Sequence, residues 1–128
     1  MLTNAKTATT LPVVDLDRAK AFYKDKLGLK ATDDVPGGTM FEAGSGQRVM
    51  LYQRERTKAD HTVIGFHVED VEKEVKELQG KGIEFEEYDM PNLKTENFIA
   101  TMDNWKSAWF KDTEGNILSI NEMKWNST

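Results

Sequence analysis

The feature that most constrains the fold is an order of elements that occurs twice along the chain. Residues 8–14 (ATTLPVV) resemble a strand in composition, and residues 16–28 follow with apolar side chains at helical spacing. Residues 61–68 alternate as a strand does, and residues 71–82 again carry apolar side chains on one helical face. The same strand and helix therefore recur at an offset of about 55 residues.

Both predicted helices have recognisable ends. An acidic residue stands before each helix, Asp15 or Asp17 in the first half and Asp70 in the second. Its side-chain oxygen can accept hydrogen bonds from the amide groups that have no partner within the helix. Gly28 follows the first helix, where glycine tolerates the left-handed backbone with which many helices end.

Shorter strand-like runs follow each helix. They are LKATDDV, TMFEA and QRVMLYQRE in the first half, and IEFEEYDM, SAWFKD and NILSINEM in the second. This order predicts an α+β fold in which two βαβββ modules, at about residues 5–57 and 58–125, form a single domain over residues 1–128.

Composition limits the classes of function. The 17 basic and 22 acidic residues give a formal net charge of -5 without a basic block, so we expect no nucleic-acid partner. The absence of cysteine excludes disulfides, thiolate metal sites and a cysteine nucleophile. No apolar run approaches the roughly 20 residues that cross a bilayer, and no signal peptide is evident, so we expect a soluble cytoplasmic protein without a membrane partner.

Three longer runs carry a family resemblance that covers nearly the whole chain. They are VVDLDRAKAFYKDKLGLK, FHVEDVEKEVKELQGKGIEF and FKDTEGNILSI. Together they resemble the vicinal oxygen chelate superfamily, which includes glyoxalases, bleomycin-resistance proteins, fosfomycin-modifying enzymes and extradiol dioxygenases. The resemblance implies that the two modules form a cupped, half-open barrel, usually in a homodimer that contributes to each cup. It does not by itself imply an activity.

The resemblance also implies where metal ligands would stand. Members that bind a divalent ion typically place a His seven residues before the Asp that begins each module's helix, and a Glu three residues after the Gly-Asn of the last run. The corresponding residues here are Ala8, Val63 and Ser119. Because none of them offers an imidazole or a carboxylate, we predict no metal cofactor.

The last run also contains an acidic turn with Asp112, Glu114 and Asn116. These side chains could offer oxygen ligands to a hard cation, but their spacing does not match an EF-hand loop. We therefore interpret the turn as a hairpin corner between two strands, at which Gly115 allows a sharp bend.

Alternation along the strands predicts the side chains that face the cup. In the last strand Ser119 and Asn121 face away from the core, and in the preceding strand Trp109 does. The predicted ligand-binding residues are His67, Tyr88, Trp105, Trp109, Ser119 and Asn121. For residues 48–54 both faces remain possible, because the run is apolar throughout.

Each of these assignments has a plainer alternative. His67 could be a donor or general base, or a half-exposed sheet histidine with a hydrogen-bonded neighbour. The aromatic side chains could contact a flat ligand, or they could fill the barrel or a dimer contact. The long segment 89–107 could be a binding loop in which Lys94 and Asn97 contact a polar ligand, or a solvated connection.

Two functions from different classes then compete. The first is a metal-independent protein that binds a small aromatic or amphipathic molecule and possesses a drug-sequestering role, as the bleomycin-resistance branch does. The alternative is a glyoxalase-like lyase or isomerase, or a dioxygenase, with an atypical divalent-metal site. No catalytic residue can be assigned for it from the sequence.

Overall fold

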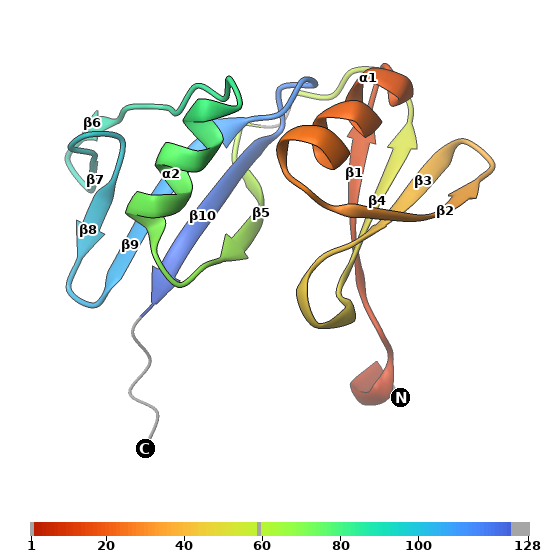
Figure 1. Ribbon diagram of the computed structural model, residues 1–128, viewed down its shortest axis with the longest axis horizontal. Coiled ribbons are helices and arrows are strands. Elements are labelled where there is room, and N and C mark those ends of the chain that lie inside the picture. Colours follow the sequence, from red (N-terminus) through yellow and green to blue (C-terminus); the bar gives the residue numbers. More distant parts are fainter. Residues whose placement is uncertain (1, 59, 124–128) are drawn as a thin grey trace. The chain divides into compact units, whose positions relative to one another are not determined.

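Both predicted modules are present, and each builds its own sheet (Figure 1). Contacts within the chain divide it into the units Met1–Lys58 and Ala59–Thr128. The computed structural model describes residues 2–58 and 60–123, so the predicted end of the second module, near residue 125, lies outside the described residues. None of the helices described here combines the length and the apolar character that a membrane-spanning helix requires.

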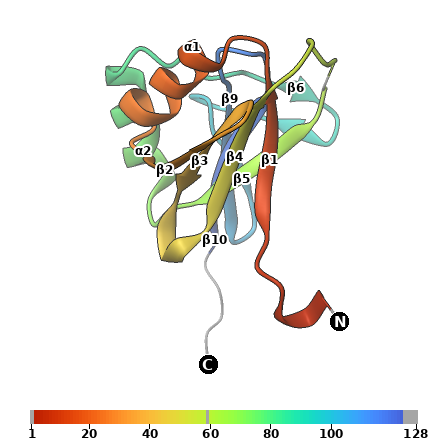
Figure 2. The same ribbon diagram turned by 90° about the vertical axis from the view of Figure 1, so that its right-hand side faces the viewer.

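The first unit has a sheet with the strand order β1-β4-β3-β2. Its elements are η1 (Leu2–Asn4), β1 (Ala8–Val13), α1 (Leu16–Ala21), η2 (Phe22–Lys26), β2 (Lys30–Val35), β3 (Gly38–Glu42), η3 (Gly44–Gly46) and β4 (Arg48–Gln53). β1 runs parallel to β4, as Figure 2 shows, and the other neighbouring strands are antiparallel.

The second unit repeats this topology in the order β5-β10-β9-β8. Its elements are β5 (Thr62–His67), α2 (Val71–Gly80), β6 (Asp89–Met90), β7 (Leu93–Lys94), β8 (Ala100–Met102), β9 (Trp105–Lys111) and β10 (Ile117–Met123). β5 runs parallel to β10, whereas β6 and β7 form a separate hairpin. The predicted α+β fold of two βαβββ modules is confirmed.

The helix ends follow the capping signals. Asp15, rather than Asp17, caps α1 by accepting a hydrogen bond from the Arg18 amide, and Asp70 caps α2 by accepting one from the Lys73 amide. The first helix is not uniform, because α1 ends at Ala21 and continues as the π-helical segment η2. Gly28 then adopts the predicted left-handed backbone, with φ at 74°.

Apolar side chains from α1 and η2 cover one face of the first sheet. The fully buried side chains are Leu11, Val13, Tyr23, Phe41, Val49 and Leu51. Val49 and Leu51 therefore face the core, which decides the open question at residues 48–54. Met50 and Tyr52 lie half-buried on the opposite face of the sheet, which carries no helix.

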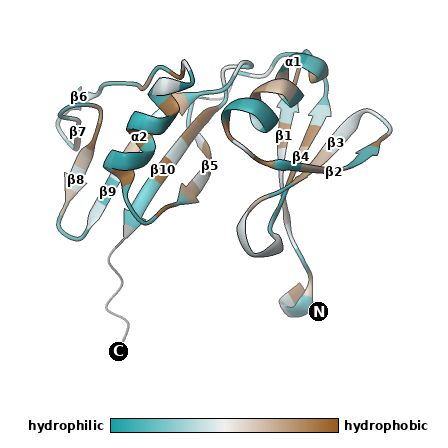
Figure 3. Cartoon of the chain, viewed as in Figure 1, coloured by the Kyte–Doolittle hydropathy of each residue, from teal (hydrophilic) through white to brown (hydrophobic). Residues whose placement is uncertain are grey.

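In the second unit, α2 packs on one face of β9 and β10 (Figure 1). Val71 and Val75 of this helix are buried together with Ala108, Phe110, Leu118 and Ile120 of the strands. The outward side of α2 is hydrophilic, as the colouring in Figure 3 shows. We call the opposite face of this sheet the helix-free face.

The structure corrects the prediction for residues 83–107. The run IEFEEYDM is not one strand, because only Phe85 forms an isolated bridge with Phe110 of β9 before the chain leaves the sheet. The chain returns as β8, which pairs with the other end of β9. The supposedly irregular segment 89–107 therefore contains a hairpin and two strands of the main sheet.

Candidate functional site

Strand pairing brings most of the predicted ligand-binding residues onto the helix-free face of the second sheet. On β10, Asn121 pairs with His67 of β5 and with Ser107 of β9. Ser119 pairs in the same way with Gly65 and Trp109. Because paired residues of neighbouring strands share a face, these side chains form two adjacent rows.

A chain of hydrogen bonds links the polar side chains of this face. The Trp105 indole N–H donates to Ser107 Oγ, and the Ser107 hydroxyl donates to Asn121 Oδ1 over 2.7 Å. Asn121 Nδ2 in turn donates to Ser119 Oγ over 3.1 Å. Ser107 is only 1% exposed, Asn121 7% and Ser119 4%. These hydrogen bonds link the four side chains in one continuous chain, which holds them in one arrangement.

Ser107 links two predicted residues, Trp105 and Asn121, but was not itself predicted from the sequence. The signal was available, since Ser107 has the same alternation as Trp105 and Trp109. A serine between two tryptophans does not by itself indicate a site, however. Its role becomes clear only from its pairing with Asn121.

Aromatic side chains lie beside the polar network. Tyr88 contacts Trp109 edge to face, with ring centroids 5.5 Å apart. Burial, and to a smaller degree the nearby Glu86 carboxylate, raises the pKa of the Tyr88 hydroxyl above its ordinary value. Tyr88 therefore presents a neutral phenol at neutral pH.

A β-bulge allows the Trp109 side chain to reach across the sheet. Ile117 pairs with Thr62, but the next residue of β10, Leu118, pairs with Ile64, so Val63 has no opposite residue on β10. The bulge places Thr62 on the helix-free face, where its hydroxyl accepts a hydrogen bond of 3.2 Å from Trp109 Nε1. The indole of β9 thus extends over β10 to β5.

The positions at which the family places metal ligands do not form a donor set. Val63 lies in the bulge, and Ser119 Oγ accepts the hydrogen bond from Asn121. Ala8 begins β1 in the other unit. Within residues 2–58 and 60–123, no three His, Asp or Glu side chains lie close enough together to hold a metal ion.

His67 is exposed at the end of β5, on the helix-free face beside Asn121. Its imidazole is thus accessible to a ligand on this face.

The acidic turn between β9 and β10 is the predicted hairpin corner. Asp112 Oδ1 accepts hydrogen bonds from the amides of Glu114 and Asn116, and Asp112 Oδ2 accepts one from Asn116 Nδ2. Gly115 has a φ of 83°. Both carboxylate oxygens of Asp112 therefore hold the turn together.

A separate groove of about 720 Å³ lies in the second unit between α2 and the segment that leads into β8. Its lining residues are Glu72, Val75, Lys76, Gln79, Lys94, Glu96, Asn97, Phe98, Ile99 and Thr101. Lys94 and Asn97, which the sequence suggested as polar contacts, line this groove. None of the residues predicted to face the cup does so.

Both units have the same strand order, and proteins built from two such βαβββ modules form one fold class. The chain belongs to the Glyoxalase/Bleomycin resistance protein/Dioxygenase superfamily, whose family profile matches residues 7–120. The family resemblance found in the sequence is thereby confirmed. A search among curated proteins finds no match.

Solved structures of similar fold include proteins with different roles. An antibiotic binding protein from Streptomyces sp. CB03234, TnmS3, has a TM-score of 0.71 and 20% identity, covering 97% of this chain and 99% of its own. Lactoylglutathione lyase from Agrobacterium tumefaciens has a TM-score of 0.68 and 24% identity over 95% and 96%. The fosfomycin resistance protein FosX from Listeria monocytogenes has a TM-score of 0.69 and 16% identity over 94% of each chain. At these identities the similarity shows the fold alone.

Proposed function

We propose that this chain is a metal-independent binding protein for a small aromatic or amphipathic molecule, which it holds on the helix-free face of the second sheet. The observation that carries the proposal is the state of Ser119. At the position where metal-binding relatives are expected to present a carboxylate, a buried hydroxyl is instead engaged with Asn121. A neutral serine in this network is a poor ligand for a divalent ion.

The aromatic side chains support a flat organic ligand. Trp109 is half-buried and is held by Tyr88 on one side and by the Thr62 hydroxyl at its Nε1 atom. An indole fixed in this way offers a rigid apolar surface, and ordering it costs little on binding. The similarity in fold to an antibiotic binding protein is compatible with a drug-sequestering role.

The remaining parts of the proposal come from the composition and the family. We expect a cytoplasmic homodimer without a nucleic-acid partner, in which His67, Trp105 and Asn121 contribute to the ligand site. Light scattering of the purified protein measures the oligomeric state directly.

Equilibrium dialysis with 2-acetonaphthone, a flat aromatic ketone, tests the proposed function. We expect saturable binding that is unchanged after the protein is treated with EDTA, together with elemental analysis that finds no stoichiometric Zn, Ni, Mn or Fe. Trp109→Ala should weaken binding roughly tenfold or more, since it removes the main aromatic contact.

Phe98→Ala is the matched control, because Phe98 is also half-buried and aromatic but lines the separate groove. The affinity of Phe98→Ala for 2-acetonaphthone should equal that of the wild type. Binding that disappears on chelation, or one tightly held equivalent of metal, would favour the enzyme alternative. Loss of binding in Phe98→Ala rather than in Trp109→Ala would assign the ligand to the groove.

A further inference from the structure

Hydrogen bonding on the helix-free face has a direction. The Trp105 indole N–H can only donate, so Ser107 Oγ accepts from it. The Ser107 hydroxyl then donates its own proton to Asn121 Oδ1. This contact fixes the amide of Asn121, which turns its Nδ2 atom toward Ser119. The direction is set by chemical type, because an indole nitrogen has no acceptor lone pair to offer.

The chain of donors ends with protons that have no acceptor. Ser119 Oγ accepts from Asn121 Nδ2, which leaves the Ser119 hydroxyl proton free to donate. Asn121 Nδ2 carries a second proton as well. Among the residues that the structure describes, none accepts either proton. Both side chains are more than nine-tenths buried, so bulk water satisfies these donors poorly.

Gly65 lies against both donors. It pairs with Ser119 across β5 and β10 and is itself exposed. A Cβ atom at this position would lie 2.7 Å from Asn121 Nδ2 and 3.0 Å from Ser119 Oγ. The two donors therefore lie directly against the backbone of Gly65, and no side chain at this exposed residue covers them. We call Gly65 together with these two donors the Gly65 notch.

We infer that the Gly65 notch receives an oxygen acceptor of the ligand, a carbonyl or carboxylate carried by an aromatic body that lies against Trp109. Two donor protons face the notch from Ser119 and Asn121, against a single remaining lone pair on Ser119 Oγ, so a ligand oxygen that only accepts satisfies the notch better than a ligand group that only donates. Trp109 is the neighbour of Ser119 on β9, which places the aromatic surface beside the acceptor site. The inference rests on the proposed function and specifies the chemistry of its ligand.

Two neutral probes test the inference. 2-Acetonaphthone carries a carbonyl oxygen, and 2-ethylnaphthalene has the same carbon skeleton without it. In equilibrium dialysis we expect the ketone to bind roughly five- to tenfold more tightly, because only the ketone satisfies the free donors. In the wild-type protein, NMR should show the Asn121 side-chain amide protons shifting with the ketone and not with the hydrocarbon.

Two variants connect this preference to the notch. Ser119→Ala removes one donor, and Asn121→Asp replaces the amide by a carboxylate that accepts the Ser119 proton itself. Both should lower the affinity for the ketone more than the affinity for the hydrocarbon, so that the ratio of the two affinities falls from roughly five- to tenfold toward one. Lys76→Ala and Lys94→Ala in the groove are controls that should leave the ratio of the two affinities unchanged.

The outcomes separate the two proposals. Equal affinity for both probes, or a preference for the ketone that persists in Ser119→Ala and falls in Lys94→Ala, would overturn the inference and leave the proposed function standing. Binding of neither probe would count against the proposed function and, with it, the inference. If either variant fails to fold, the NMR shifts of the Asn121 amide protons in the wild type still test whether the ketone oxygen binds at the notch.

Discussion

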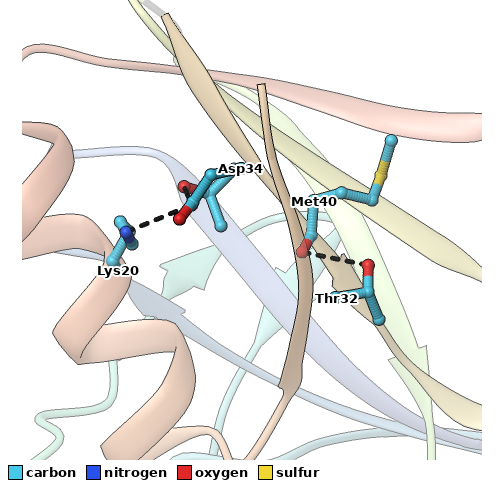
Figure 4. A network of polar contacts seen from close by, with 5 residues as sticks. Lys20, Thr32, Asp34 and Met40 are labelled. Atoms are coloured by element: carbon cyan, nitrogen blue, oxygen red, sulfur yellow. Dashed lines mark hydrogen bonds and ion pairs between the residues drawn. The ribbon is translucent and has the colours of Figure 1, made fainter. Parts of the chain in front are cut away.

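At the residue scale, Asp34 shows how one exposed carboxylate couples folding to pH. Figure 4 shows it on β2, with the Lys20 ammonium of α1 3.3 Å from Oδ1. The Thr39 hydroxyl donates to the same oxygen over 2.8 Å. The Thr39 hydrogen bond first, and then Lys20, hold the pKa of Asp34 below its ordinary value of 3.8. The folded state therefore favours the charged form.

We expect Asp34→Asn to remove a contribution to stability that depends on pH. Because the pKa of Asp34 is lower in the folded than in the unfolded protein, its carboxylate stabilises the folded state at pH values above the unfolded pKa of about 3.8. This contribution is lost as the pH falls through the folded pKa. Urea unfolding should therefore show Asp34→Asn less stable than the wild type at pH 6, with the difference shrinking below pH 3.8.

Asp33→Asn is the matched control for this experiment. Asp33 precedes Asp34 on β2, pairs with Met40 of β3 and makes no ion pair among the described residues. It should show no such pH-dependent difference. If the difference in the free energy of unfolding between Asp34→Asn and the wild type stayed constant down to pH 2, the pH dependence would not come from Asp34.

Sequence reasoning at this scale succeeded where strands alternate strictly. Ser119 and Asn121 lie on one face of β10, with Leu118 buried on the other, as a period of two requires. Alternation alone does not place the Thr62 side chain on the helix-free face, because the bulge at Val63 shifts the alternation by one residue. A bulge depends on the pairing of two distant strands, which a single run of letters does not contain.

At the element scale, one strand position of the second sheet is filled by two separate stretches. Phe85 bridges Phe110, and the Glu86 amide donates to the Trp109 carbonyl, whereas β8 pairs with the opposite end of β9. Between them the chain makes the β6–β7 hairpin. Alternating residues before this excursion predicted a full strand. The short β8 was missed because three residues carry little periodic signal.

Thr95 anchors this excursion to the site. Its buried hydroxyl accepts from the Tyr88 amide over 2.9 Å and donates to the Tyr88 carbonyl. Thr95→Val keeps the shape but leaves the Tyr88 amide without its acceptor, whereas the Tyr88 carbonyl keeps the hydrogen bond from the Thr95 amide. We expect a loss of about 1–3 kcal/mol in the free energy of unfolding. Because Thr95 holds Tyr88 beside Trp109, the affinity for 2-acetonaphthone should fall as well.

Thr101→Val makes the same chemical change at an exposed position of β8. Its stability should stay within about 0.5 kcal/mol of the wild type, with unchanged affinity for the probe. If Thr95→Val lowered stability without any effect on binding, Tyr88 would have no part in holding the ligand.

At the scale of the whole molecule, the internal repeat was the strongest predictor of the fold. Both units have the same strand order, and each buries its own apolar core. A repeat predicts topology well because each copy supplies the same connections between strands and helix. It says little about chemistry, since β4 carries Met50 and Tyr52 at the places in the first sheet where β10 carries Ser119 and Asn121 in the second.

The net charge of -5 adds a property that no single site carries. Two ligands with the same aromatic body and an oxygen acceptor, neutral 2-acetonaphthone and anionic 2-naphthoate, should bind the notch with different salt dependence. The protein as a whole repels the carboxylate at low ionic strength, where the Debye length is about 30 Å at 0.01 M, and this repulsion is screened at 0.15 M, where it is about 8 Å.

We therefore expect the affinity for 2-naphthoate to rise by about two- to threefold from 0.01 to 0.15 M NaCl, measured by equilibrium dialysis, and that for 2-acetonaphthone to stay nearly constant. Salt-dependent weakening of 2-naphthoate would indicate direct contact with a cation, as Lys76 or Lys94 in the groove would provide. Because the notch offers neutral donors and the groove offers ammonium groups, the sign of the salt effect distinguishes the two locations.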